Sequence, residues 1–175
     1  MKLMICGHGR HGKDVCAEII HGCMDLTFGA SSWVLAEEVV YPVLKDKYDY
    51  RTLMDCFDDR SNHRAEWFDL LQEYNTPDDA KLGRKIFAKY DMYVGIRRAE
   101  EFFAVQSAGL FDLSIWVDAS ERLPPEGTDS CTVQPWMCDI IIQNNGTQED
   151  FKVKIRNLCK NLKVSWKQYL WGIFK

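Results

Sequence analysis

The chain has 175 residues, of which 46% are hydrophobic and 27% charged, and its formal net charge at pH 7 is -4. This length and balance are typical of one globular domain, with at most a small inserted lid, and they exclude an intrinsically disordered chain. The acidic balance argues against a general binder of duplex DNA, because neutralising DNA phosphates requires a basic face. A small anionic ligand needs only a local positive pocket and remains compatible with this charge.

The cysteines and the apolar runs indicate a cytoplasmic protein. No stretch approaches the roughly 18 apolar residues of a membrane span, and the apolar run before Gly7 is too short for a signal peptide. The seven cysteines are odd in number and form no C-x-x-C pair. We therefore expect reduced thiols, no zinc ribbon, and no membrane or duplex nucleic acid among the partners.

Short unbroken apolar runs alternate with helical patterns along the chain. Strands are predicted over 3–6, 92–96, 113–117 and 140–142, and helices over 12–23, 33–47, 62–74, 76–90, 98–107 and 148–161. Ser31 or Ser32 is the expected N-cap of the second helix, which Pro42 bends or shortens. Thr76 is the expected N-cap of the fourth, with Pro77 at its first helical position.

This alternation predicts an α/β fold in which helices cover both faces of a parallel sheet of about five strands, in one domain spanning 1–175. The polar segment 119–135 has no regular pattern. The segment 163–175 carries aromatic residues at helical spacing, namely Trp166, Tyr169 and Phe174. It is interpreted as a helix that closes the core, with a homodimer contact or another partner surface as the alternative.

A glycine-rich loop follows the first predicted strand. Its sequence, Gly7-His8-Gly9-Arg10-His11-Gly12-Lys13-Asp14, matches G-x-x-x-x-G-K with Asp in place of the usual Ser or Thr. Glycines let successive backbone N–H groups converge on an anion, the next helix adds its positive N-terminus, and the lysine reaches the phosphates. The strand before the loop and the helix after it are the context that this motif requires. The pattern predicts nucleotide-phosphate binding by Gly7, Gly9, Arg10, His11, Gly12, Lys13, Asp14 and Val15.

Two acidic residues are candidate metal ligands. A hydroxyl normally ligates Mg²⁺ at the position of Asp14, whose carboxylate would do so directly or through water. Asp118 closes the strand 113–117 and either holds a water on Mg²⁺ or caps its own loop. The side chains of His8, Arg10 and His11 either face solvent or add phosphate contacts. Arg10 suits phosphate best, because its planar guanidinium presents its N–H donors in a fixed geometry.

If the loop binds a phosphoryl donor, transfer to a second nucleotide would also require neutralisation of an acceptor phosphate in line with the donor. Arg60 and Arg64 are four residues apart, and Trp67 follows one turn later on the same predicted helical stripe. Such a stripe would clamp a phosphate and stack on a base; the alternative is a solvated arginine pair balanced by Asp58, Asp59 and Glu66. Arg97 directly follows the strand 92–96, at the edge where parallel sheets bind ligands. Arg122, the single basic residue of 119–135, is either a transition-state cation or an ordinary exposed arginine.

Together these segments resemble the P-loop deoxynucleoside monophosphate kinases of bacteriophages, within the wider nucleoside monophosphate kinase group. The resemblance is carried by Gly7–Asp14 with its Gly-Lys-Asp ending, Gly95-Ile96-Arg97 followed by Glu100-Glu101-Phe102, Ile115-Trp116-Val117-Asp118, and Asp139-Ile140-Ile141-Ile142 leading to Asn144-Asn145-Gly146-Thr147. Many relatives have Thr after Gly-Lys-Asp, where Val15 stands here.

The resemblance implies a three-layer P-loop kinase fold with a lid at 119–135, ATP as the phosphoryl donor, Mg²⁺ as the metal and a deoxynucleoside monophosphate as the acceptor. It implies catalytic roles for Lys13, Arg97 and Arg122, with Arg97 on the acceptor phosphate. It also places the turn with Asn144, Asn145 and Gly146 beside the donor adenine, the alternative being a plain turn from strand to helix. Two alternatives remain open: a related kinase of phosphomevalonate or dephospho-coenzyme A, and a nucleotide-binding module without catalysis.

Overall fold

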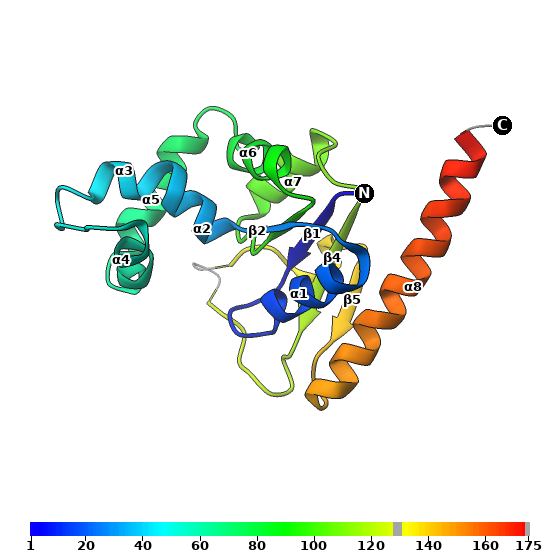
Figure 1. Cartoon of the computed structure of the whole chain (residues 1–175). Coiled ribbons are helices and arrows are strands. Elements are labelled where there is room, and N and C mark those ends of the chain that lie inside the picture. Colours follow the sequence, from blue (N-terminus) through cyan, green and yellow to red (C-terminus); the bar gives the residue numbers. More distant parts are fainter. Residues whose placement is uncertain (128–130, 174–175) are drawn as a thin grey trace.

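The computed structural model describes residues 1–127 and 131–173, with side chains described as far as Val164. Its centre is a five-stranded parallel sheet in the order β2-β3-β1-β4-β5 (Figure 1). The strands are β1 (Leu3–Cys6), β2 (Phe28–Ala30), β3 (Met92–Val94), β4 (Leu113–Asp118) and β5 (Ile140–Gln143). The α/β fold predicted from the sequence is confirmed. The sequence prediction missed the three-residue edge strand β2.

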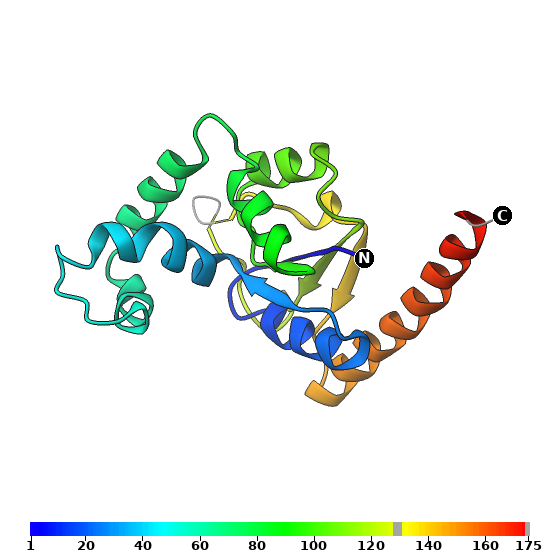
Figure 2. The ribbon, with the colours of Figure 1, turned by 45° about the horizontal axis from the view of Figure 1, so that its top comes forward.

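Helices cover both faces of the sheet, as predicted. On one face lie α1 (Lys13–Met24) and the first part of α8 (Gln148–Ile173), and on the other lie α6 (Lys81–Lys89) and α7 (Ala99–Ser107) (Figures 1 and 2). Leu3 and Ile5 of β1 pack with α1 and α8, whereas Met4 and Cys6 pack with α6 and α7. Successive strand residues point to opposite faces, so the short apolar run of β1 contributes to two hydrophobic cores.

Between β2 and β3 the chain forms a group of helices that projects beyond the edge of the sheet (Figure 2). It contains α2 (Ser31–Leu35), a π-helical turn (Ala36–Val40), α3 (Tyr41–Leu44), α4 (Leu53–Asp58), a 3-10 turn (Asp59–Ser61) and α5 (Arg64–Asn75). The expected helix 33–47 is thus a helical run ending at Leu44 whose geometry changes just before Pro42. The expected serine cap is wrong: Ala30 is the N-cap, and the Ser31 hydroxyl donates to the Gly95 carbonyl at 2.9 Å.

The expected start of the fourth helix at Thr76 is also wrong, because α6 begins at Lys81. The Thr76 hydroxyl donates back to the Gln72 carbonyl in α5 at 2.8 Å, so it ends one helix instead of starting the next. Asp78 accepts a hydrogen bond from the Ala80 N–H at 3.0 Å and holds the turn that precedes α6.

The last helix, α8, is longer than predicted. It begins after Thr147, whose hydroxyl accepts the Asp150 N–H at 3.1 Å while the Asp150 carboxylate accepts the Thr147 N–H at 3.1 Å. It continues to Ile173 as one helix whose C-terminal part runs away from the sheet (Figure 1). The prediction that the aromatic side chains of 163–175 pack on the core or on a partner lies outside the described residues.

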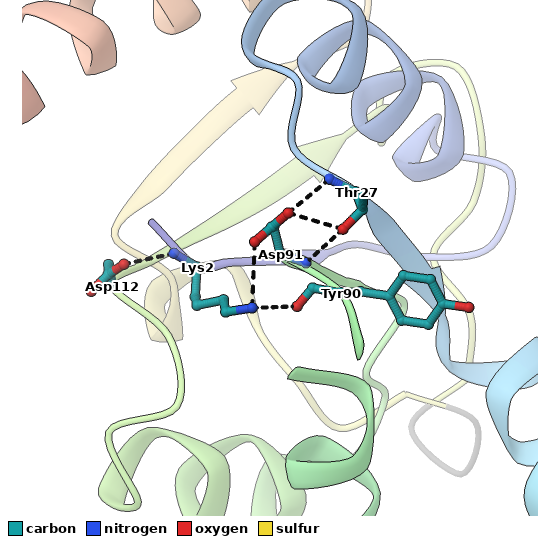
Figure 3. Close-up of polar contacts among 5 residues, drawn as sticks. All are labelled: Lys2, Thr27, Tyr90, Asp91 and Asp112. Atoms are coloured by element: carbon teal, nitrogen blue, oxygen red, sulfur yellow. Dashed lines mark hydrogen bonds and ion pairs between the residues drawn. The ribbon is translucent and has the colours of Figure 1, made fainter. Parts of the chain in front are cut away.

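A polar cluster lies at the amino ends of the strands, whereas the glycine-rich loop lies at their carboxyl ends (Figure 3). The Asp91 carboxylate, just before β3, accepts hydrogen bonds from the N–H and hydroxyl of Thr27, just before β2, at 3.0 and 2.9 Å. Lys2, just before β1, donates its backbone N–H to Asp112 at 2.6 Å and its ammonium to the Tyr90 carbonyl at 2.7 Å. These contacts tie together the entrances of four strands and so fix their register.

All seven cysteines are free thiols, five of them buried. Among the described helices, none combines the length and the apolar character that crossing a bilayer requires.

Candidate phosphate-binding site

The glycine-rich loop lies at the switch point of the sheet. It connects the carboxyl end of β1 to α1, and β1 has β3 on one side and β4 on the other. In chain order, β2 and β3 are added on one side of β1, and the later strands β4 and β5 lie on the other side. Ligands of open parallel sheets bind outside the carboxyl ends of the strands at such a point. Arg97, Asp118 and Asn145 follow or end β3, β4 and β5, so they lie on the same edge as the loop.

The backbone of the loop requires glycine at two positions. Gly7 has φ of 140°, and a Cβ there would lie 2.5 Å from the Val117 carbonyl oxygen of β4. Gly12 has φ of 102°, and its Cβ would lie 2.7 Å from the Asn144 amide nitrogen. Side chains at these positions would be strained by the backbone and would also collide with their neighbours. The glycines of the motif therefore hold the loop tightly against β4 and β5.

Side chains from the ends of β4 and β5 hold the loop in place. The Asn144 amide donates to the His11 carbonyl at 2.8 Å, and the Ala119 N–H donates to His11 Nδ1 at 3.0 Å. Because Nδ1 accepts a hydrogen bond, the imidazole is neutral with its proton on Nε2. Burial also lowers the pKa of His11, which favours this neutral form. Of the two alternatives for these side chains, exposure to solvent holds for Arg10 and is excluded for His8 and His11, which are both buried.

Lys13 folds back over the loop. Its side chain is only 8% exposed, and its ammonium donates to the His8 carbonyl at 2.6 Å. Burial, and then the nearby positive charge of Arg97, lower the pKa of Lys13. The positive charge of Arg97 therefore acts on the Lys13 ammonium, which is buried against the loop.

A carboxylate that the sequence prediction missed joins Arg97 to the loop. Glu126 Oε1 accepts from the Arg97 guanidinium at 2.7 Å, and Glu126 Oε2 accepts from the Gly9 N–H at 2.6 Å. No local spacing connects Gly9 with a residue 117 positions later, so the sequence carries no signal for this contact. Lys13, Arg97, Glu126 and the loop backbone thus form one charged cluster.

Other predicted site residues lie around this cluster at the ends of β4 and β5. The Arg122 guanidinium donates through Nε to the Asn144 carbonyl at 2.7 Å, which holds it beside the turn after β5. Asn145, in that turn, donates to the Gln143 side chain at 2.6 Å and accepts the Glu121 N–H at 3.2 Å. Gly146 follows it and is exposed.

Of the two candidate metal ligands, Asp118 caps its own loop, because its carboxylate accepts both the N–H and the hydroxyl of Ser120 at 3.1 Å. Asp14 is exposed in the first turn of α1, beside Val15. Among the described residues there is no group of three metal-ligating side chains. Mg²⁺ in nucleotide sites is generally held by one or two carboxylates together with the phosphates, so Asp14 fits such a role.

The predicted stripe of Arg60, Arg64 and Trp67 is wrong. Arg60 lies in the 3-10 turn before α5, where it donates to the Phe57 carbonyl at 2.7 Å and covers the Phe57 ring at 4.0 Å. Arg64 begins α5 and is exposed, whereas Trp67 is 7% exposed and belongs to the hydrophobic core. The early helix α4, started by a Thr52 capping box, breaks the helical periodicity that the prediction assumed.

The alternative, a solvated arginine pair, fits the two arginines, because both are exposed. Two of the three acids expected to balance them contact other residues instead. The Asp59 carboxylate accepts the Tyr50 hydroxyl at 2.7 Å and lies 3.0 Å from His63 Nε2. The Glu66 carboxylate pairs with the Lys47 ammonium at 2.6 Å and accepts the Tyr48 hydroxyl at 2.8 Å. Neither arginine makes a described contact with the cluster around Lys13.

Comparison of the sequence with models of known protein families finds no match, and comparison with curated proteins finds none either. The geometry of the loop and its neighbours is therefore the basis for a functional proposal.

Proposed function

We propose that the chain is an ATP-dependent kinase that transfers the γ-phosphoryl group to a deoxynucleoside monophosphate. The observation that carries this proposal is the loop from Gly7 to Gly12, which connects the carboxyl end of β1 to the N-terminus of α1 with Lys13 and Arg97 beside it. An anion at this place meets backbone N–H groups, the positive end of a helix and two cations together.

The residues around the loop fit the donor phosphates. The first N–H groups of α1 have no partner within the helix and are available to phosphate oxygens. Lys13, Arg97 and Arg122 supply the positive charge that the transferred group requires, and Asn145 and Gly146 border the adenine. Mg²⁺, held by Asp14 and the phosphates or through water by Asp118, would supply further neutralisation. No covalent intermediate is needed, because phosphoryl transfer depends on positioning and charge.

The acceptor phosphate is assigned to Arg97 and Arg64. Arg97 follows β3 at the carboxyl edge, and its side chain is 44% exposed. Arg64 is exposed at the start of α5, in the helical group that projects beyond β2. Trp67 is not assigned to base stacking, because its ring is buried in the core. These substrates are available in the cytoplasm, where we place the protein.

The test is the release of ADP from ATP and Mg²⁺ with a panel of acceptors: the four deoxynucleoside monophosphates, phosphomevalonate and dephospho-coenzyme A. We expect ADP release that depends on a deoxynucleoside monophosphate and that is lost in Lys13→Met. ADP release with only phosphomevalonate or dephospho-coenzyme A would support a phosphotransferase activity but contradict the proposed class of acceptor.

A nucleotide-binding module without catalysis is the second candidate. It is favoured by one observation: the Lys13 ammonium and the Arg97 guanidinium are both held by acceptors of the protein itself. This candidate predicts ATP binding with no ADP release above background for any acceptor in the panel.

A further inference from the structure

The Glu126 carboxylate makes the contacts that a phosphate group would make at this loop. One of its oxygens accepts the Gly9 N–H at 2.6 Å, and the other accepts the Arg97 guanidinium at 2.7 Å. A backbone N–H of a glycine-rich loop and an arginine are both typical donors to phosphate oxygens. The loop also admits this carboxylate closely, because a Cβ at Gly9 would lie 2.9 Å from Glu126 Oε1.

The electrostatics of the site favour an ionised carboxylate at this position. Burial alone would raise the pKa of Glu126, but the hydrogen bonds from Arg97 and the Gly9 N–H outweigh it and lower that pKa. The positive charge of Lys13 acts in the same direction. The glutamate therefore neutralises Lys13 and Arg97, the two cations beside the loop.

We propose that Glu126 is an internal competitor of the nucleotide: its carboxylate occupies the anion position of the loop, and a phosphate group of ATP displaces it from the Gly9 N–H and so releases Arg97 for the phosphates of the reaction. This inference rests on the proposed nucleotide binding and adds a self-inhibiting contact to it. Every ATP molecule that binds must first break two charge-assisted contacts, so the apparent affinity of the loop for phosphate is reduced.

The displacement needs only a small rearrangement, because the chain on both sides of Glu126 is anchored independently. On one side the Ala119 N–H is held by His11. On the other side the Thr132 N–H donates to the Arg97 carbonyl at 2.8 Å, and the Thr132 hydroxyl accepts the Ala99 N–H at 2.8 Å. Rotation of the Glu126 side chain away from Gly9 leaves these anchors intact.

The direct test compares Kd values by calorimetry for ATP and for inorganic tripolyphosphate. The proteins are the wild type, Glu126→Gln and the control Glu121→Gln. Glu121 is exposed in the same segment, and its carboxylate makes no hydrogen bond or ion pair with the described residues. We expect Glu126→Gln to bind both ligands about tenfold more tightly than the wild type, since a charge-assisted contact no longer competes. The control should bind both ligands like the wild type.

Equal Kd values in all three proteins, or weaker binding by Glu126→Gln, would overturn the inference and leave the nucleotide site in place. If none of the three binds either ligand, the proposed function fails together with the inference. Tighter binding of tripolyphosphate as well as ATP shows that the competition concerns the phosphates and not the base.

A second measurement uses the wild-type protein alone and does not depend on the folding of a variant. The amide resonance of Gly9 should follow the ionisation of Glu126 in an acid titration, because the two groups share a hydrogen bond. Saturating ATP should remove this dependence. A Gly9 resonance that titrates in the same way with and without ATP would overturn the displacement.

Discussion

Glu101 is a buried acid outside the phosphate site, and its ionisation makes a testable contribution to stability. It lies on α7 with its side chain 2% exposed, and its carboxylate accepts the Tyr93 hydroxyl at 2.6 Å. Burial raises the pKa of Glu101 from 4.5 to about 7, although the Tyr93 hydrogen bond and the charge of Arg98 act in the opposite direction. One hydrogen bond and one cation do not replace the hydration that an ionised carboxylate loses.

The sign of the pH effect follows from where each state releases its proton. In the unfolded chain the carboxyl ionises near pH 4.5, whereas in the fold it holds its proton to about pH 7. The free energy of unfolding is therefore highest below pH 4.5 and falls as the pH rises to about 7. A tenfold change in proton affinity is worth about 1.4 kcal/mol. The difference in the pKa of Glu101 between the two states therefore lowers the free energy of unfolding by about 3 kcal/mol at pH 8 and by less than about 1 kcal/mol at pH 5, relative to its value at low pH.

Glu101→Gln removes the charge and keeps an oxygen that accepts the Tyr93 hydroxyl. We expect this variant to exceed the wild type in free energy of unfolding by about 3 kcal/mol at pH 8, measured by urea denaturation, with a much smaller gain at pH 5. Glu100→Gln, an exposed neighbour on α7, is the control and should change little at either pH. An equal effect of Glu101→Gln at the two pH values would show that burial does not hold the proton on Glu101.

Two further predictions concern the loop. Lys13→Met keeps much of the buried stem but removes the ammonium, so kcat should fall by about 10²–10³ with the fold intact by circular dichroism; turnover within tenfold of the wild type would contradict the role of Lys13. Asp14→Asn should weaken activation by Mg²⁺ more than it weakens ATP binding, measured as kcat against metal concentration and as Kd for ATP. An unchanged Mg²⁺ requirement would make Asp14 a structural acid and Asp118 the next residue to test.

The sequence predicts the core of this fold well because its strands have a local signal. Buried parallel strands are unbroken apolar runs, and the strand predicted over 3–6 has the same limits as β1, Leu3–Cys6. The errors occur where a contact distant in sequence competes with a local rule. Ser31 was expected to cap its own helix, but its hydroxyl finds the Gly95 carbonyl instead. The short strand β2 and the short helix α4 carry too few residues for periodicity to detect them.

In the candidate site, too, the features with a local signal are predicted from the sequence and the contacts between distant segments are not. The loop and Arg97 were predicted because the motif is local and a strand end has a defined place in a parallel sheet. The contacts that shape the site join segments far apart in the sequence, such as Asn144 with His11 and Glu126 with Gly9. Whether a charged side chain in a polar loop faces solvent or the site depends on where that loop lies in the fold.

The pairing of charges at the loop explains why an acid belongs there at all. Burial, and then the positive charge of Arg97, lower the pKa of Lys13, so the two cations destabilise each other when no anion is near them. The proposed nucleotide binding nevertheless requires both cations to be charged and in place. Glu126 fulfils this requirement, because its negative charge interacts favourably with Arg97 and Lys13. A triphosphate carries several negative charges and can replace it at the same donors. If the proposed competition holds, the strength of the Glu126 contacts sets how much negative charge a ligand must carry to displace this glutamate.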